Sequence, residues 1–516
     1  MGLVAVVVLC LVIVWAMADV VRSYPSTFYP RFWDEAVYAI DATTPGVVFG
    51  KFTSDLHYAA AKPGYGLPLV GAVALFGERG LMYLSTVFWG LTVFLLGITV
   101  LRRFGAIAGL FAAALLVYSP LFGKYVAETG PTTLAAFCLV LLWVVYGKRR
   151  FWLTGAVIGY LALIDLKWMP PVAMSVLIVE LLLERRRPWR ERLVYLSGAA
   201  VVAAAFPAIL TLIHRPFGDY LWHYVFNHAR FVGPEPSAIF GYYLFRFGAA
   251  PAVVLSAAAW LFLRSGTCPS GPDKSAVRSL YYALVLSCAP IVFYSVFGPL
   301  KVLRFFAVPF PLFVVPITVG VVMAATWCGE KIHRIQLLPR WVAMSCPAVL
   351  MGAVILIGSD GPAKHLRVQS CFPEAIERLS KIATRNGNVS SYIWPVVFYG
   401  WRYTVKTYPF TLWGLASSDK WLAMDPILDR VTVENRLYLD PTGGKSPESF
   451  LVQQQNALRP SLDSLFSVPS DFFASDYFLS EQVVGGIPTL LRWQGYRESG
   501  ANYMTIFRVN PSKQPD

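Results

Sequence analysis

Long apolar runs recur along roughly the first 360 positions of the chain, and short polar segments separate them. Runs of about 20 apolar residues are typical of membrane-spanning helices, because a helix satisfies its own backbone polar groups inside a bilayer. The pattern predicts eleven such spans, at 3–19, 80–101, 104–119, 131–147, 152–167, 169–184, 193–213, 247–263, 279–298, 305–327 and 341–358.

Charged positions between the runs predict which side of the membrane each loop faces. Sixteen of the 44 Lys and Arg residues lie in five short connections, 102–104, 148–151, 184–192, 264–278 and 329–340. Lys and Arg collect in cytoplasmic loops, so these five are expected inside. The intervening segments and everything after about position 359 are then expected outside the cytoplasm.

The segment "KPGYGLPLVGAVALFGERG" at 62–80 resembles a further span but has only about 13 apolar residues, which is short for one. Counting it as a span would also place every later basic loop outside. We therefore predict an interfacial or re-entrant helix in the first outer loop. We also expect the first span to be retained. A signal peptide usually has Lys or Arg before its apolar run, and none precedes this one.

The polar character of the chain rises after position 359, where helical and strand-like patterns mix. Helical spacing occurs at 373–385 and 448–458, and strand-like stretches occur at 391–401 and 503–509. A segment of this length suits one independent domain. We expect a transmembrane domain at 1–359 and an extracytoplasmic α/β domain at 360–516.

Composition supports this polytopic α-helical membrane class. Hydrophobic residues make up 56% of the chain and charged residues only 14%, against about 25% charged in ordinary soluble domains. The net charge of +14 follows from the cytoplasmic loops, so it does not indicate a nucleic-acid partner. The seven cysteines show no metal-binding spacing.

Acidic and basic residues gather at the predicted outer surface, within aromatic sequence. The stretch "YPRFWDEAVYAI" carries Asp34 and Glu35 just beyond the first span, and "YVAETGPTT" carries Glu128. The basic candidates are Lys62 in "KPGYGLP", Lys167 in "LIDLKWMPP", and Lys301 and Arg304 in "GPLKVLRFFAVPFP".

This mixture suits group transfer from a lipid-linked phosphate donor. A carboxylate near the acceptor can serve as general base on a hydroxyl. Lys and Arg can hold a phosphate and stabilise negative charge on the leaving group. Aromatic and apolar walls suit a polyprenyl tail and the faces of sugars.

"RFWDEAVYA" after a first span resembles the signature of the GT-C-type glycosyltransferases. These include the protein O-mannosyltransferases and the aminoarabinose transferase that modifies lipid A. The resemblance covers about residues 1–360. It implies a GT-C-like fold and transfer of a hexosyl or pentosyl group, with inversion, from a polyprenyl-phosphate-linked donor to a lipid, glycan or protein acceptor. We also expect a bacterial inner membrane.

The resemblance assigns roles to matching positions. Asp34 and Glu35 correspond to the acidic motif, with Asp34 favoured as catalytic base. Glu128 falls where the family places its second-loop acid. Lys62 and Pro63 in "KPGYGLP" resemble a Lys-Pro-Pro stretch that helps to grip the donor phosphate, with Gly64 in place of the second Pro. Arg304 corresponds to a late basic residue, with Phe305 in place of the usual Tyr. The second-loop acid is Glu instead of Asp, so no metal ligand is assigned. Whether the protein uses a divalent metal is left open.

Structural readings compete with each of these roles. Asp34 and Glu35 can be a solvated pair that caps a helix start, and the basic residues can snorkel to lipid headgroups. Asp165 and Lys167 can simply pair with each other at the end of a span. A transporter or flippase of a lipid-linked or anionic solute is the rival function, but it should hold its ionisable residues near the bilayer midplane. A non-catalytic subunit with a degenerate site is a third reading.

Overall fold

The computed structural model describes most of the membrane region and part of the C-terminal region. The described residues are 2–24, 33–43, 62–212 except 183 and 186, 274–297, 304–334, three single positions between 345 and 352, and five strands between 388 and 509. The predicted spans 247–263 and 341–358 fall almost wholly outside them, as do residues 373–385, 392–401 and 448–458.

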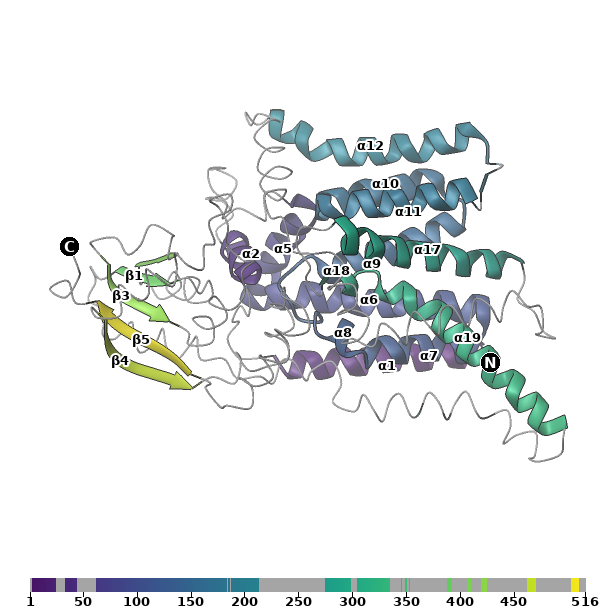
Figure 1. Ribbon diagram of the computed structural model, residues 1–516, viewed down its shortest axis with the longest axis horizontal. Coiled ribbons are helices and arrows are strands. Elements are labelled where there is room, and N and C mark those ends of the chain that lie inside the picture. The colour runs from purple at the N-terminus through teal and green to yellow at the C-terminus, as the bar shows by residue number, and fades with distance from the viewer. Residues whose placement is uncertain are drawn as a thin grey trace.

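Helices dominate the described part of the first 334 residues (Figure 1). They are α1 (Gly2–Arg22), α2 (Trp33–Thr43), α5 (Pro63–Phe76), α6 (Gly80–Phe104), α7 (Ala106–Val117), α8 (Pro120–Gly123), α9 (Thr132–Gly147), α10 (Phe151–Ile164), α11 (Met169–Leu182), α12 (Trp189–Leu212), α17 (Lys274–Phe297), α18 (Arg304–Ala307) and α19 (Phe310–Arg334), with 3-10 turns η1 (Gly77–Arg79) and η2 (Leu166–Trp168).

Nine of the eleven predicted spans coincide with a helix in the described part of the chain. Four helical segments there are long and apolar enough to cross a membrane by length and composition: Gly2–Arg22, Pro63–Phe104, Ser275–Phe293 and Phe310–Trp327. The segment at 62–80 is helical, as expected, and its interfacial placement stays a prediction. The predicted span at 305–327 is wrong at its start, because two turn residues, Val308 and Pro309, separate α18 from α19.

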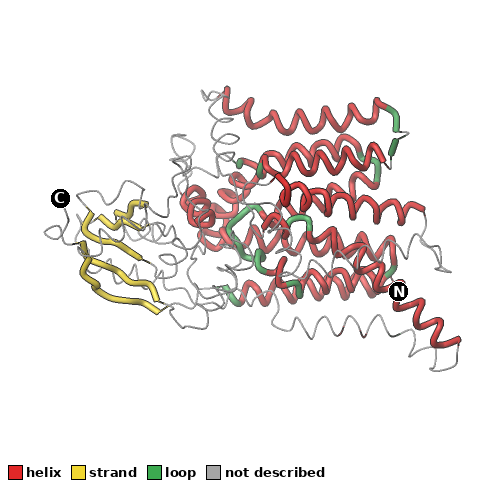
Figure 2. Tube along the Cα trace, viewed as in Figure 1, coloured by secondary structure: helices red, strands yellow, loops and turns green. Residues whose placement is uncertain are grey.

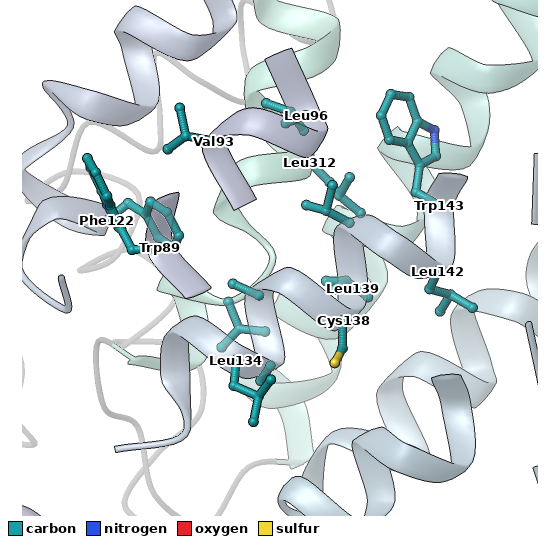
Figure 3. Close-up of a cluster of buried hydrophobic side chains, with 14 of the residues drawn as sticks. Trp89, Val93, Leu96, Phe122, Leu134, Cys138, Leu139, Leu142, Trp143 and Leu312 are labelled. Atoms are coloured by element: carbon teal, nitrogen blue, oxygen red, sulfur yellow. The ribbon is translucent and has the colours of Figure 1, made fainter. Parts of the chain in front are cut away.

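Helix α6 lies at the centre of the packing, in contact with α1, α5, α7, α9 and α19. Its apolar faces meet those of its neighbours in one core (Figure 3), where the ring of Trp89 stacks on that of Phe122 with 6.5 Å between centroids. The outward face of α1 stays apolar: Leu3 and Leu11 are exposed. A helix that is apolar on both its core and outer faces suits a lipid surrounding.

Glycines allow α10 and α12 to approach closely. Gly155 and Gly159 form a Gly-x-x-x-Gly pattern on α10, and Gly198 faces them from α12. A Cβ added at Gly159 would lie 2.5 Å from the carbonyl oxygen of Ala199. Small residues at this spacing let backbones pack directly, which is a common way for helices to associate in membranes.

Buried charges join helices at the end of the bundle where α6 and α9 finish. Glu180, Glu184 and Arg187 are each less than 10% exposed. Arg187 pairs with Glu180, and its Nη2 atom lies 3.3 Å from Oε2 of Glu184. We call these three residues, with Arg192 and Arg278, the arginine cluster.

Two further arginines and two tyrosines complete the partners of these carboxylates. Arg192 Nε lies 3.2 Å from Glu180 Oε2, and Arg278 Nε lies 3.4 Å from Glu184 Oε1. The Tyr146 hydroxyl donates to Glu180 Oε1 at 2.5 Å, and the Tyr282 hydroxyl donates to Glu184. The cluster therefore links α9, α11, α12 and α17.

The described strands of the C-terminal region form one mixed sheet, separate from the helices (Figure 2). Its order is β2 (Lys406–Pro409), β1 (Asn388–Ser391), β3 (Asp419–Met424), β5 (Tyr503–Val509), β4 (Leu462–Pro469). β1 runs parallel to β2 and β3, whereas β5 runs antiparallel to β3 and β4. The strand predicted at 503–509 is confirmed as β5.

Candidate functional site

Helix α2 presents a buried face to the bundle. Glu35, Tyr38, Ala39 and Ala42 are buried, at the spacing that places residues on one side of a helix. The Glu35 side chain is only 1% exposed, and its Oε1 atom accepts a hydrogen bond from the backbone N–H of Thr129 at 3.2 Å. The acidic motif on α2 thus contacts the loop between α8 and α9 directly.

The loop between α8 and α9 is fixed by the first turns of α6. The Ser85 hydroxyl donates to the carbonyl oxygen of Glu128, and the Thr129 hydroxyl donates to the carbonyl oxygen of Leu81 at 3.1 Å. The Glu128 side chain folds over Gly130, where an added Cβ would lie 2.9 Å from its Cδ atom. Glu128 is 3% exposed, so two buried carboxylates, Glu35 and Glu128, occupy this loop junction.

Two lysines share one carboxylate beside this junction. Asp165 Oδ2 lies 3.2 Å from Lys62 Nζ and 2.8 Å from Lys167 Nζ. The side chains of Lys62 and Asp165 are 4% and 3% exposed, and that of Lys167 is 28% exposed. The three groups, which we call the lysine bridge, carry a formal charge of +1. A net cationic group beside buried carboxylates is suited to an anionic ligand.

The local sequence places this bridge between two helices. α10 ends where Asp165 adopts an extended conformation, and the single turn η2 then carries Lys167. The Lys167 backbone N–H donates to Asp165 Oδ1 at 3.3 Å. Lys62 arrives from the start of α5, which packs on α10 through Gly64: the Tyr160 hydroxyl donates to the Gly64 carbonyl oxygen at 2.7 Å.

Aromatic rings join the acidic and basic parts. Lys62 Nζ lies 5.5 Å from the centroid of the Tyr38 ring, which meets the Tyr65 ring edge-on at 5.1 Å. The buried Tyr65 hydroxyl is close enough to Glu35 and Glu128 to interact with both carboxylates electrostatically. Lysine ammonium groups over aromatic faces gain a favourable cation–π contact. The carboxylates and Lys62 therefore belong to one site.

Helix α18 closes the other side of the lysine bridge. Lys167 Nζ lies 4.8 Å from the centroid of the Phe305 ring, and Trp168 meets that ring edge-on at 5.7 Å. Arg304 directly precedes Phe305 as the first residue of α18. Helix α18 thus lies next to Lys167.

Four of the seven predicted site residues have described side chains: Glu35, Lys62, Glu128 and Lys167. The structure brings all four to this end of the bundle. Asp34 lies on α2 and Arg304 on α18, but their side chains lie outside the described part, and Lys301 lies outside the described residues altogether.

Tyr38, Tyr65 and Thr129 were not among the site residues predicted from the sequence. Tyr38 follows Glu35 by three positions, so helical spacing could have placed both on one face. No pattern in the neighbouring sequence indicates a role for Thr129, because it contributes its backbone N–H and not its side chain. The pairing of Asp165 with Lys167 is confirmed, and Lys62 joins them. Within the described residues no cluster of three His, Cys, Asp or Glu side chains offers a metal site.

No protein-family model matches the sequence, and no curated protein matches it significantly. Solved structures do match in fold. The crystal structure of ArnT from Cupriavidus metallidurans in the apo state aligns with a TM-score of 0.58 at 14% identity, over 100% of this chain and 99% of that chain. The chain has an ArnT-like fold.

A second ArnT crystal structure from the same organism, bound to undecaprenyl phosphate, aligns with a TM-score of 0.55 at 12% identity over 99% of both chains. ArnT is the lipid A aminoarabinose transferase, a GT-C enzyme. The resemblance expected from the acidic motif is thereby confirmed at the level of the fold. The apolar helices and this fold are those of a polytopic integral membrane protein.

Proposed function

We propose that the protein is a membrane glycosyltransferase that moves a sugar from a polyprenyl-phosphate-linked donor to an acceptor hydroxyl at the outer face of the membrane. The proposed membrane is the inner membrane of a bacterium. The observation that carries the proposal is the site itself: Glu35 and Glu128 are buried beside the lysine bridge at one end of an ArnT-like helical bundle. Binding of undecaprenyl phosphate to one ArnT structure supports a lipid-linked donor.

In the proposed reaction, the Asp34 carboxylate accepts the proton of the acceptor hydroxyl. The hydroxyl oxygen forms a bond to the anomeric carbon as the bond from that carbon to the phosphate oxygen breaks. Both electrons of the broken bond stay on the phosphate oxygen, so polyprenyl phosphate leaves with an added negative charge. Inversion at the anomeric carbon is taken from the GT-C resemblance.

The lysine bridge would stabilise that leaving group. Lys62 and Lys167 present a net positive charge, and preorganised cations lower the energy of a transition state in which negative charge develops. Lys301 and Arg304 are proposed to add donor contacts from the loop before α18. Glu35 is proposed to position α2 through the Thr129 N–H, and the C-terminal domain to hold the acceptor or close over the site.

The test uses purified protein in lipid and a panel of radiolabelled polyprenyl-phosphate sugars. We expect the wild type to release or transfer one of these sugars, and Asp34→Asn to lose at least about 100-fold in rate, as removal of a general base does. Asp19→Asn, the same substitution on α1 outside the site, is the matched control and should retain the rate.

Two results would overturn parts of this proposal. A fully active Asp34→Asn variant would move the base to Glu35 or Glu128. A wild type that binds donors from the panel but consumes none of them would favour a transporter or flippase over an enzyme.

A further inference from the structure

A basic cavity lies at the opposite end of the bundle from the lysine bridge. Its volume is about 240 Å³, and its polar lining comes from the last turn of α6, the α9–α10 turn and the first turns of α17. The lining residues that matter here are Arg103, Lys148, Arg149, Ser275, Arg278 and Ser279. Along α6, the step from Ser85 to Arg103 corresponds to roughly 27 Å at 1.5 Å per residue, so this cavity is separate from the candidate active site.

The cavity gathers four cationic side chains, and no acidic residue is among its lining. The positive charge of Arg278 is partly balanced by Glu184, whose Oε1 atom lies 3.4 Å from Arg278 Nε. Within the described part of the chain, no carboxylate oxygen lies within 4.0 Å of a basic nitrogen of Arg103, Lys148 or Arg149. Like charges held this close favour an anion between them.

Part of this lining is held rigidly. Arg103 donates to the Ser279 hydroxyl and lies with its Cζ atom 5.5 Å from the centroid of the Trp143 ring. The Trp143 indole N–H in turn donates to the Ser279 carbonyl oxygen at 2.9 Å. The guanidinium is therefore positioned before any ligand arrives, which reduces the ordering cost of binding.

Helix α17 adds the positive end of its dipole. It begins at Lys274 and extends for 24 residues, and Ser275 and Ser279 in its first turns line the cavity. The start of a helix favours negative charge, and its N–H groups point towards an anion placed there. Hydroxyl groups at the same place can donate to phosphate oxygens.

Arg149 occupies an unusual backbone position. Its φ of 56° lies in the left-handed region, where Gly or Asn normally ends a helix and other residues are disfavoured. Its N–H donates to the Tyr146 carbonyl oxygen at 3.0 Å, which ends α9. A cation is thus kept beside the cavity at a position where Gly would be more stable.

The surroundings indicate the source of the anion. Trp152, three residues beyond Arg149, is 55% exposed at the start of α10. Exposed Trp at helix ends is typical of the headgroup level of a bilayer. The positive-inside pattern predicts that this end faces the cytoplasm, and basic pockets between helices on that side bind the headgroups of anionic lipids.

We propose that this cavity binds the phosphate group of an anionic phospholipid from the cytoplasmic leaflet. Arg103, Arg278 and the start of α17 form its base, and Lys148 and Arg149 cover the phosphate from the α9–α10 turn. The phosphate is the recognised group, so a phosphatidylglycerol headgroup suits the volume. The proposal is independent of the transfer reaction and of its donor.

The experiment measures thermal unfolding of the purified full-length protein in a neutral detergent, with increasing short-chain phosphatidylglycerol. A ligand that binds the folded state raises the unfolding midpoint with its concentration, which gives an apparent Kd. We expect saturable stabilisation by phosphatidylglycerol and none by short-chain phosphatidylcholine. In Lys148→Gln/Arg149→Asn the Kd should rise at least about tenfold, because two charge-assisted hydrogen bonds to the phosphate are lost.

A matched control removes the same number of charges from the same face. Arg102→Gln/Arg150→Gln changes two exposed arginines that do not line the cavity, and its Kd should match the wild type. Asn tolerates the left-handed conformation, so the cavity variant should fold, and each variant is compared with its own lipid-free midpoint. An equal loss in both variants, or no saturable phosphatidylglycerol effect, would overturn the proposal. Equal stabilisation by inorganic phosphate at the same concentration would overturn the lipid source.

Discussion

The two ends of the helical bundle both bury carboxylates beside cations, but they do so with different chemistry. In the arginine cluster, each of Glu180 and Glu184 contacts two guanidinium groups and a tyrosine hydroxyl. In the lysine bridge, one carboxylate, Asp165, is divided between two ammonium groups. In the first arrangement each carboxylate is held by several guanidinium and hydroxyl donors, whereas in the second two ammonium groups depend on one carboxylate.

The difference separates a structural role from a binding role. Arg presents a planar fork with five donors, which fixes several acceptors at once. Lys is a compact point charge on a flexible stem, so it can exchange a carboxylate for a phosphate without loss of geometry. The arginine cluster should therefore contribute mainly to stability, and the lysine bridge mainly to donor binding.

The largest expected effect is at the arginine cluster. Arg187→Met leaves Glu180 and Glu184 without their shared cation, and removal of one partner from a buried ion pair costs about 3–5 kcal/mol. The measurement is the free energy of unfolding in detergent. Arg190→Met, the same substitution at an exposed position on the adjoining turn, is the control. A loss at Arg187 no larger than that of the control would show that the cluster is not a structural link.

A smaller effect is expected where packing supports the lysine bridge. In Gly64→Ala the new Cβ would lie 2.7 Å from the Ile164 backbone nitrogen and 2.8 Å from the Leu163 carbonyl carbon. Overpacking of this kind costs about 1–3 kcal/mol, and α5 must move away from α10, which separates Lys62 from Asp165. We expect lower stability together with a raised KM for the lipid donor.

Gly71→Ala on the same helix is the matched control, because an added Cβ there meets nothing within 4 Å. It should leave both stability and KM near the wild-type values. If Gly64→Ala lowers stability and leaves the KM unchanged, the position of Lys62 does not determine donor binding.

The smallest expected effect on stability is at Lys167. Its side chain is 28% exposed and Lys62 still pairs with Asp165 after its removal, so Lys167→Gln should change the unfolding free energy by less than about 1 kcal/mol. Loss of one phosphate contact should raise the donor KM about tenfold, which corresponds to about 1.4 kcal/mol. Steady-state kinetics with varied donor test this, with the exposed Arg79→Gln as control.

Sequence patterns predicted helix positions well because apolar runs depend on local composition. α6 and α9 begin within one residue of their predicted starts. The start of α12 was missed by four residues, because the polar residues that precede its apolar run still extend the helix from Trp189. Helix starts of this kind depend on propensity and flanking residues more than on hydrophobicity.

The site was predictable only in part, for a physical reason. Lys167 and Asp165 are two residues apart, so their pairing follows from local sequence. The contact of Lys62 with Asp165 depends on how α5 packs against α10, and burial of Arg187 depends on its carboxylate partners and the neighbouring helices. Neither is encoded in the residues on either side: the stretch "ERRRPWRER" indicates a basic loop, yet Glu184 and Arg187 are buried.

The unequal exposure of the two lysines gives the bridge a mixed response to ionic strength. Dissolved ions screen charges that face water and have little access to buried ones. Rising salt should therefore weaken the contact of Asp165 with Lys167 first, while the contact with Lys62, where both side chains are at most 4% exposed, persists. The Lys62–Asp165 contact therefore keeps its geometry as the salt concentration changes, whereas the Lys167–Asp165 contact varies with it.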